Sequence, residues 1–365
     1  MNNAVSRRLH RIDPEMMSPN ISPTSDADVK KPYFVGVDVG GTNLKLGLVG
    51  DDGRTVAYVT MPTQQERGAE DACLRMAHAV EHMLSHAGID RGDVVRAGIA
   101  TPGPMDATRE MILRPGNLPG WWDFPIRERF GCALNLPVTF VNDANAAAYG
   151  EFWRGTGQKS SSIVLLTLGT GIGGGIIIGD TLVEGEHSCG GECGHILIDP
   201  AKDARRDSLG NRGTLEAYTN AAAVIDRATA AINAGQPTSL AKRRAGGEEI
   251  TPRVVAEEAE CGDPVAREVV METARYLAIG IVTLIHAIDP DAVVLGGAMN
   301  FGGPSTQLGR DFLQHIREEV QPRLLEPLRE KVHIEFASLG GDAGYIGAAG
   351  LARVEYRKQR QRADV

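Results

Sequence analysis

The stretch Asp38-Val39-Gly40-Gly41-Thr42-Asn43-Leu44-Lys45 decides the fold, because it joins two segments with the alternating, β-branched pattern of strands. The strands are expected over Tyr33–Val39 and residues 43–49, as a β-hairpin with the Gly-Gly-Thr sequence at its tip. Glycines let main-chain N–H groups approach a phosphate closely, so this tip and Lys45 are candidates for binding one. Asp38 would suit a Mg²⁺ ion on that phosphate, held through water. For one hairpin alone, an ordinary β-turn with a solvated Lys45 and Asp38 is the alternative.

A second glycine-rich turn follows a second strand, Ser162–Leu168. It comprises Gly169, Thr170, Gly171, Ile172 and Gly173, and a strand is expected after it over residues 174–178. Residues 35–50 align with residues 164–179 as strand, turn and strand, a weak internal repeat that suggests two halves offering one hairpin each to the same ligand. The first turn is neither a P-loop nor a dinucleotide-binding fingerprint, since a strand and not a helix follows its glycines.

Strands and helices alternate along the rest of the chain, which predicts an α/β protein. Helices are expected over Ala69–Ala87, from residue 144 onward, and over residues 220–234, Pro264–Ile288, 313–328 and 343–355. Strands are expected over residues 56–61, 94–100, 137–141, 292–295 and 332–337. We expect a disordered leader over 1–32, an N-terminal α/β domain over 33–141 and a C-terminal α/β domain over 142–342. A last helix, 343–356, would pack back on the first domain, ahead of a basic tail over 357–365.

Composition excludes several classes of protein. Of the 365 residues 42% are hydrophobic and 23% are charged, which excludes a disordered chain. The net charge of −9 argues against general affinity for nucleic acid or anionic membranes. Five unevenly spaced cysteines do not form a disulfide framework, and a reducing cytoplasm is the expected location. Residues 160–179 are uncharged but hold six glycines, so we expect no membrane span there.

The Asp38–Lys45 stretch resembles the Asp-x-Gly-Gly-Thr-x-x-Lys signature of the ROK family (repressors, open reading frames, kinases), and the resemblance extends over about residues 33–352. It implies a two-domain ribonuclease-H-like fold of the actin and hexokinase superfamily, with a nucleotide and sugar cleft between the domains. It also implies a homodimer or homotetramer that phosphorylates hexoses from ATP with Mg²⁺. Gly296-Gly297-Ala298 and Gly340-Gly341-Asp342 look like the family's adenosine-side turns, although Gly341 stands where an acidic residue is usual.

Asp143 lies at an expected strand-to-helix junction, in Val141-Asn142-Asp143-Ala144. Phosphoryl transfer to a sugar hydroxyl needs a carboxylate within hydrogen-bond reach of that hydroxyl. The resemblance implies that Asp143 is this catalytic base and that Asn142 clamps a hydroxyl. The alternative is that Asp143 is only a helix N-cap, since Asp before an Ala-rich segment is what capping prefers.

Further sugar contacts are implied by the same resemblance. Glu192-Cys193-Gly194-His195 matches a Glu-x-Gly-His motif whose Glu and His bind the sugar, and Glu216 matches a third sugar-contacting carboxylate. Gly103 and Asn117 resemble additional contacts. The adjacent Trp121 and Trp122 would either stack on a sugar or pack in a lid.

The family pattern breaks after His195. Most members continue into Cys-x-Cys-Gly-x-x-Gly-Cys-x-Glu, in which three cysteines and the histidine hold a structural zinc ion. Here those three positions are Asp207, Leu209 and Thr214, which do not complete a four-coordinate site, so we expect no zinc. Some other group must then fix the tautomer of His195. His187, Cys189, Cys193 and His195 form a rival cluster, but we expect Cys189 and Cys193 to be buried thiols.

The favoured function is that of a cytoplasmic ATP-dependent hexokinase-type enzyme, a glucokinase, with no nucleic-acid or membrane partner. Kinases for N-acetylmannosamine, N-acetylglucosamine, fructose or allose are alternatives within the family. A sugar-responsive transcriptional regulator is an alternative of another class, but it would carry a helix-turn-helix domain, and only 32 residues precede Tyr33. An actin-like assembly protein or chaperone ATPase would lack the set of sugar-site residues.

Overall fold

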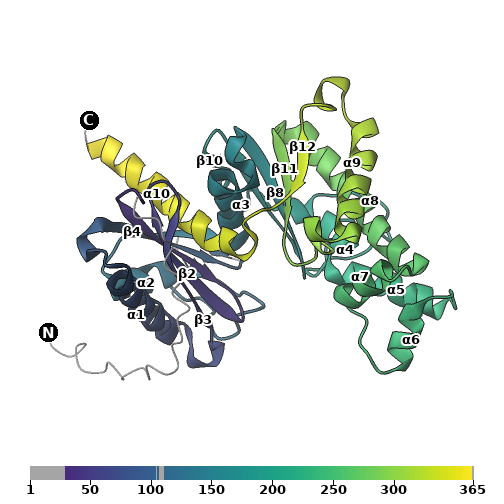
Figure 1. Cartoon of the computed structure of the whole chain (residues 1–365), viewed down its shortest axis with the longest axis horizontal. Coiled ribbons are helices and arrows are strands. Elements are labelled where there is room, and N and C mark those ends of the chain that lie inside the picture. Colours follow the sequence, from purple (N-terminus) through teal and green to yellow (C-terminus); the bar gives the residue numbers. More distant parts are fainter. Residues whose placement is uncertain (1–28, 104, 107–110, 364–365) are drawn as a thin grey trace.

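The computed structural model describes residues 29–103, 105–106 and 111–363, which form two lobes, each around a five-stranded sheet (Figure 1). Residues 1–28 of the expected leader lie outside the described part. Residues 29–32 pack on the first lobe, and so differ from a disordered leader: Asp51 N donates to Lys30 O at 2.8 Å, and the Tyr33 hydroxyl donates to Val29 O at 3.4 Å.

The first sheet has the strand order β3-β2-β1-β4-β7. Its strands are β1 (Tyr33–Val39), β2 (Asn43–Gly50), β3 (Thr55–Pro62), β4 (Val94–Thr101) and β7 (Val138–Asn142). β1 and β2 form the expected antiparallel hairpin, with Asp38 opposite Lys45, whereas β1, β4 and β7 run parallel. Thr101 pairs with Asn142, so the carboxyl ends of the three parallel strands lie at one edge of the sheet.

The second sheet repeats this order and these directions, as β10-β9-β8-β11-β12. Its strands are β8 (Ser162–Leu168), β9 (Ile172–Ile178), β10 (Thr181–Leu182), β11 (Ala292–Gly296) and β12 (His333–Phe336). The uncharged residues 160–179 therefore form a hairpin. β9 begins two residues earlier than expected, so Gly173 lies within the strand opposite Thr167, and the turn comprises only residues 169–171.

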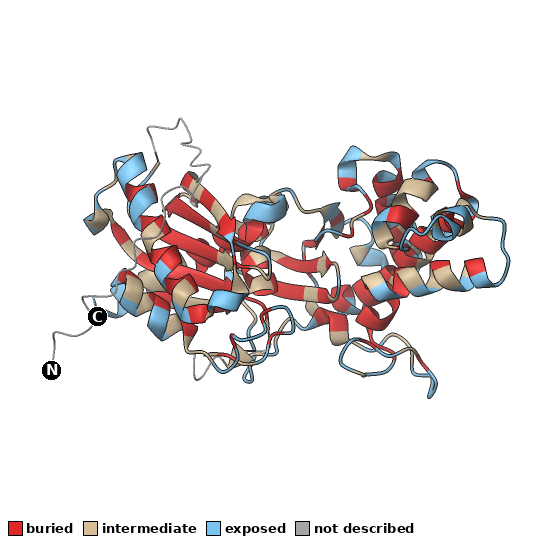
Figure 2. Ribbon diagram, turned by 90° about the horizontal axis from the view of Figure 1, so that it is seen from below, coloured by how far each residue is buried: buried red, intermediate tan, exposed pale blue. Residues whose placement is uncertain are grey.

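Helices cover the two sheets, and the strands of both sheets are largely buried (Figure 2). The first lobe has α1 (Ala69–Ala87), α2 (Ile126–Leu134) and a small sheet of β5 (Met105–Asp106) and β6 (Met111–Ile112). The second lobe has α4 (Leu215–Thr219), α5 (Ala221–Asn233), α6 (Ser239–Ala245), α7 (Pro252–Glu260), α8 (Pro264–Ile288) and α9 (Gln307–Val320). By length and composition alone α8 could cross a membrane, but 56% of its apolar window is buried inside the protein, as in a core helix.

The helix expected over 313–328 was wrong in its bounds. α9 begins earlier because the Thr306 hydroxyl accepts a hydrogen bond from Gly309 N and caps the helix. It ends at Val320, since Pro322 and Pro327 follow, and each is the second residue of a short 3₁₀ turn.

Two helices, α3 (Asp143–Arg154) and α10 (Ala343–Ala363), cross where the lobes adjoin (Figure 1). Glycines allow this close crossing: a Cβ on Gly347 would lie 1.6 Å from Ala146 O, and one on Gly36 in β1 would lie 1.9 Å from Tyr345 O. α10 continues through the residues expected as a separate basic tail, and its Arg357 pairs with Asp51 of the first lobe at 2.7 Å.

Candidate active site

The candidate site begins where β1, β4 and β7 end, at Asp38, Gly103 and Asn142-Asp143. Ligands of open α/β sheets bind beyond the carboxyl ends of parallel strands. Asn142 Oδ1 accepts hydrogen bonds from Ala144 N at 2.9 Å and Asn145 N at 3.3 Å, so Asn142 is the N-cap of α3. The alternative that Asp143 is the cap is wrong, because Asp143 is the first helical residue. The amide nitrogen of Asn142 lies beside Gly103, 3.5 Å from where a Cβ there would stand.

Asp143 has the electrostatic character of a general base. Burial and, to a smaller extent, the neighbouring carboxylates of Asp38 and Glu192 together raise its pKa to about 6, against a hydrogen bond that Ala144 N donates at 2.8 Å. A base is most effective when its pKa lies near the working pH, where it is ionised and still able to hold a proton. Of the acidic side chains at this edge of the first sheet, Asp143 therefore suits proton abstraction best.

Asp38 lies between the first hairpin and the start of α10. A Cβ on Gly344 would stand 2.6 Å from the Asp38 carboxylate, so this helix approaches Asp38 closely. Burial raises the pKa of Asp38, and Lys45 opposes the shift. Among the residues that the structure describes, no hydrogen bond to this carboxylate contributes to the shift, so both oxygens are available to a ligand. A hard oxygen donor of this kind fits a hydrated Mg²⁺ ion.

Lys45 reaches across the molecule. Its Nζ donates to Gly341 O at 2.6 Å, which ties the first hairpin to the turn before α10. That bond uses only one of the three N–H groups of the ammonium, so a phosphate contact by Lys45 would not require it to leave Gly341.

The tip of the first hairpin, which is expected to bind phosphate, is held as a tight loop. Gly40 N donates to Asn43 O at 3.0 Å, and the Thr63 hydroxyl and N–H donate to Gly40 O at 2.6 Å and Thr42 O at 2.8 Å. A Cβ on Gly41 would stand 2.8 Å from Asn117 O, so the segment that carries Asn117 lies against this loop. The structure thus brings an expected sugar contact next to an expected phosphate contact.

The second hairpin adjoins the turn at Gly296-Gly297, which is expected on the adenosine side. Gly169 N donates to Gly171 O at 3.1 Å within the tip, where Thr170 is exposed. Gly297 has a φ of +89°, and a Cβ there would stand 2.3 Å from Leu168 O, so only glycine fits. Gly296 ends β11 directly before it, which places this turn beside the end of β8.

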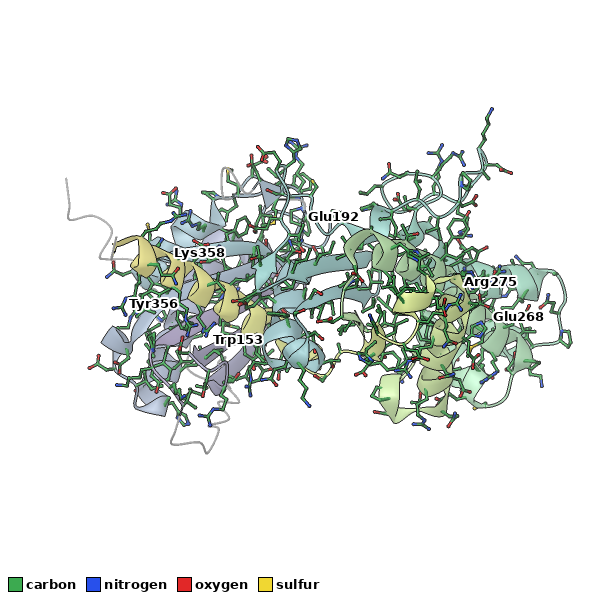
Figure 3. The ribbon with its side chains drawn as sticks, turned by 90° about the horizontal axis from the view of Figure 1, so that it is seen from above. Trp153, Glu192, Glu268, Arg275, Tyr356 and Lys358 are labelled. Atoms are coloured by element: carbon green, nitrogen blue, oxygen red, sulfur yellow. The ribbon has the colours of Figure 1, made fainter. Side chains whose placement is uncertain are left out.

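The expected sugar residues differ in their surroundings. Glu192 is exposed and lies in the middle of the molecule, where the lobes adjoin (Figure 3). Glu216 is buried, and its two oxygens accept hydrogen bonds from the Ser208 hydroxyl at 2.6 Å and from Ile172 N at 3.0 Å. Glu216 therefore links the second hairpin to the loop around Ser208, a contact that its motif did not predict.

The two adjacent tryptophans differ in their exposure to solvent. Trp121 is fully buried in the core of the first lobe, so its ring is not available to stack on a sugar. Trp122 is 55% exposed, with the guanidinium group of Arg114 5.9 Å from its ring centre.

The zinc positions do not fit a zinc ion. Leu209 is 74% exposed and has no ligating atom, while Asp207 and Thr214 bond to each other at 3.1 Å. The Asp207 carboxylate instead contacts His195 Nδ1 at 3.1 Å.

The rival cluster around His187 does not assemble either. Within the described ranges, no three His, Cys, Asp or Glu side chains gather as a metal site. Cys193 is buried, and burial raises its thiol pKa to about 12. The expectation that Cys189 is buried was wrong: it is exposed, with its Sγ 3.3 Å from His187 O, because it lies in a surface loop.

Comparison with known proteins gives the same picture as the motifs. The model of the ROK family matches residues 34–355. The glucokinase of Halalkalibacterium halodurans is 32% identical over 321 residues, 88% of this chain and 95% of that protein. A xylose repressor of Caldicellulosiruptor bescii is 27% identical over 320 residues, 87% of this chain and 77% of the repressor.

Solved structures agree in fold. A ROK hexokinase from Thermus thermophilus superposes with a TM-score of 0.77 at 34% identity, covering 89% of this chain and 99% of the other. A ROK family glucokinase from Streptomyces griseus, in complex with glucose and AMPPNP, gives a TM-score of 0.69 at 33% identity, covering 88% and 99%. The two repeated α/β lobes thus have the ribonuclease-H-like architecture of the actin and hexokinase superfamily, and the chain belongs to the ROK family.

Proposed function

We propose that this ROK sugar kinase is a glucokinase, which transfers the γ-phosphoryl group of ATP to the 6-hydroxyl of glucose. The observation that carries the proposal is the buried Asp143 carboxylate, with its pKa raised to about 6, between the Asp38 hairpin and Glu192. The glucokinase relatives and the glucose and AMPPNP complex of the Streptomyces griseus enzyme support the choice of sugar and donor.

The reaction assigns one task to each part of the site. Asp143 takes the proton of the sugar hydroxyl as its oxygen forms a bond to the γ-phosphorus; the bond from that phosphorus to the β–γ bridging oxygen breaks, and ADP leaves. The main-chain N–H groups of residues 40–42 and 169–171 would hold the phosphates. Mg²⁺, when bound through water at Asp38, would neutralise phosphate charge. The turns at Gly296-Gly297 and Gly341 would border the adenosine.

The sugar would be held on the opposite side of Asp143. Glu192 and His195 are the candidates for direct hydrogen bonds to its hydroxyls, with Asn117, Gly103 and the Asn142 amide nitrogen as further contacts. Glu216 keeps a place in this set as a proposal, although both of its oxygens already accept hydrogen bonds within the protein.

A sugar panel tests the substrate. Purified protein is given ATP, Mg²⁺ and one of glucose, mannose, fructose, allose, N-acetylglucosamine or N-acetylmannosamine, and ADP is followed by a coupled assay. We expect the highest kcat/KM with glucose. A preference for an N-acetylhexosamine would overturn the assignment to glucose, and sugar-independent or absent ADP formation with every sugar would overturn the kinase.

An isosteric change tests the base. Asp143→Asn should lower kcat by at least about 10³-fold, a loss typical of removing a general base, while calorimetry still detects glucose binding. Asp90→Asn is the matched control, because Asp90 also accepts a hydrogen bond from a main-chain N–H, that of Gly92 at 2.9 Å, but lies on the surface of the first lobe. Turnover of Asp143→Asn within tenfold of the parent would remove Asp143 from this role.

We also propose a cytoplasmic location and a homodimer or homotetramer. All five cysteines are free thiols, which supports a reducing compartment. Light scattering on the purified protein measures the assembly, and a monomer at micromolar concentration would contradict it.

A further inference from the structure

The loop over residues 207–214 is organised around one buried carboxylate, that of Asp207. The side chain has no exposed surface. Its Oδ1 accepts hydrogen bonds from Leu209 N at 3.0 Å and Asn211 N at 2.8 Å. Its Oδ2 is 3.1 Å from both Thr214 Oγ1 and His195 Nδ1. Four donors therefore surround the two oxygens, which is a complete set for a buried carboxylate.

This set keeps Asp207 ionised. Burial alone would raise the pKa of the group, but the hydrogen bonds from Asn211, His195, Thr214 and Leu209 outweigh it and lower the pKa below its usual value. A carboxylate that is ionised can only accept hydrogen bonds, so each of its four neighbours must donate.

The consequence for His195 is a defined tautomer. Because Asp207 accepts, the proton of the neutral imidazole lies on Nδ1 and the lone pair lies on Nε2. His195 ends a short 3₁₀ turn, Cys193–His195, which packs on β9: a Cβ on Gly194 would stand 2.2 Å from Ile172 O. The ring is fixed on its Nδ1 side, yet the side chain remains 28% exposed. It therefore offers a hydrogen-bond acceptor to a ligand hydroxyl.

We propose that Asp207 is the positioning residue of the sugar site, which holds His195 as the Nδ1–H tautomer and couples it, without a metal ion, to the loop over residues 207–214. The proposal rests on the proposed sugar kinase in one respect, the role of His195 as a hydroxyl acceptor. The same carboxylate also shapes the loop that delivers Ser208 to Glu216, so one residue orders two neighbours of the site.

A simpler alternative is that Asp207 only stabilises the conformation of the loop over residues 207–214. Asp207→Asn distinguishes the positioning role from this alternative, since the asparagine side chain has the same shape and its oxygen can still accept hydrogen bonds from Leu209 N and Asn211 N. Its amide group then faces His195 and donates, so Nδ1 must become the acceptor and the proton moves to Nε2. If Asp207 only stabilised the loop, this substitution would leave the tautomer of His195 unchanged.

Nitrogen-15 NMR of histidine side chains reads the tautomer directly. In the parent protein at neutral pH we expect His195, assigned by comparison with His195→Gln, to carry its proton on Nδ1. In Asp207→Asn we expect it on Nε2. A parent His195 protonated on Nε2 would overturn the proposal even if the variant failed to fold. Zinc at about one ion per chain in the purified parent would overturn the metal-free part.

Kinetics provide the second readout. We expect Asp207→Asn to raise KM for the sugar about tenfold or more, while KM for ATP stays within twofold, as suits a lost sugar hydroxyl acceptor. The matched control is Asp263→Asn, because Asp263 is a buried carboxylate that accepts from Thr238, Ser239 and Ala266 and, among the described residues, forms no hydrogen bond with a histidine. Equal rises in KM for sugar and ATP would mean that Asp207 only stabilises the loop. Absence of kinase activity in the parent protein would contradict the proposed function but not the role of Asp207, since the tautomer is measured without substrate.

Discussion

The Asp143 carboxylate is raised in pKa by burial and by two neighbouring carboxylates, and the sign of the shift predicts a pH profile. Only the ionised form can take a proton, and it becomes the minority below about pH 6. We therefore expect kcat/KM for glucose to fall about tenfold per pH unit below pH 6 and to level off above pH 7, because this ratio reports the pKa of the free enzyme's base. Circular dichroism at each pH separates this loss from unfolding. A flat profile with intact structure between about pH 5 and pH 7 would contradict it.

Candidate functional residues could be predicted from the sequence where they are adjacent in the chain. Asn142-Asp143 ends a strand and starts a helix, so its place at a strand edge followed from local pattern. The partner of His195 was not predictable, because Asp207 lies twelve residues away. The sequence showed it only as an aspartate at a position where the family has a zinc-binding cysteine. Its four donors meet through a loop whose path no local pattern specifies. The burial of Trp121 likewise depends on long-range packing.

At the scale of elements, the crossing of α3 and α10 depends on glycines that no turn requires. A Cβ on Gly347 would stand 1.6 Å from Ala146 O, a distance that only backbone movement relieves. We expect Gly347→Ala to lower the free energy of unfolding by about 3 kcal/mol, the upper range for overpacking. Gly92→Ala is the control, since its Cβ would meet only Asp90 Oδ1 at 3.5 Å, and it should change stability by less than about 0.5 kcal/mol. Urea unfolding measures both, and equal midpoints would refute the packing argument.

Elements with their own local signals were the ones that sequence predicted well. The bounds of α1 and α8 agree with expectation, because each has an apolar repeat and a clear end signal. The glycines that the sequence singled out were those of the expected nucleotide turns, yet Gly36, Gly98 and Gly150 lie within strands or helices against α10. Close approach between elements leaves no periodic trace in the sequence, so this use of glycine was missed.

At the scale of the whole molecule, the repeat found in the hairpins extends to complete sheets of the same order and direction. The hairpin alignment could indicate two related halves, but not the pairing of β1 with β4 or β8 with β11, which joins residues far apart in the chain. The duplication places one glycine-tipped hairpin, which we propose to bind phosphate, in each lobe. The proposed substrates would therefore touch both lobes at once, and neither lobe alone would hold a complete site.

This division of the site predicts a change of shape on binding. The first lobe offers residues 40–42 and Asn117, and the second offers residues 169–171 and Glu192, so a nucleotide and a sugar bound together should draw the lobes closer. We expect the pivot at the close α3–α10 crossing, where a Cβ on Gly347 would stand 1.6 Å from Ala146 O. We expect small-angle X-ray scattering to show a lower radius of gyration with glucose and AMPPNP together than with either alone. At 100 times Kd each ligand should also raise the free energy of unfolding by about 2.7 kcal/mol. Stabilisation without compaction would mean that the lobes are already closed, whereas neither effect would place the ligands outside this site.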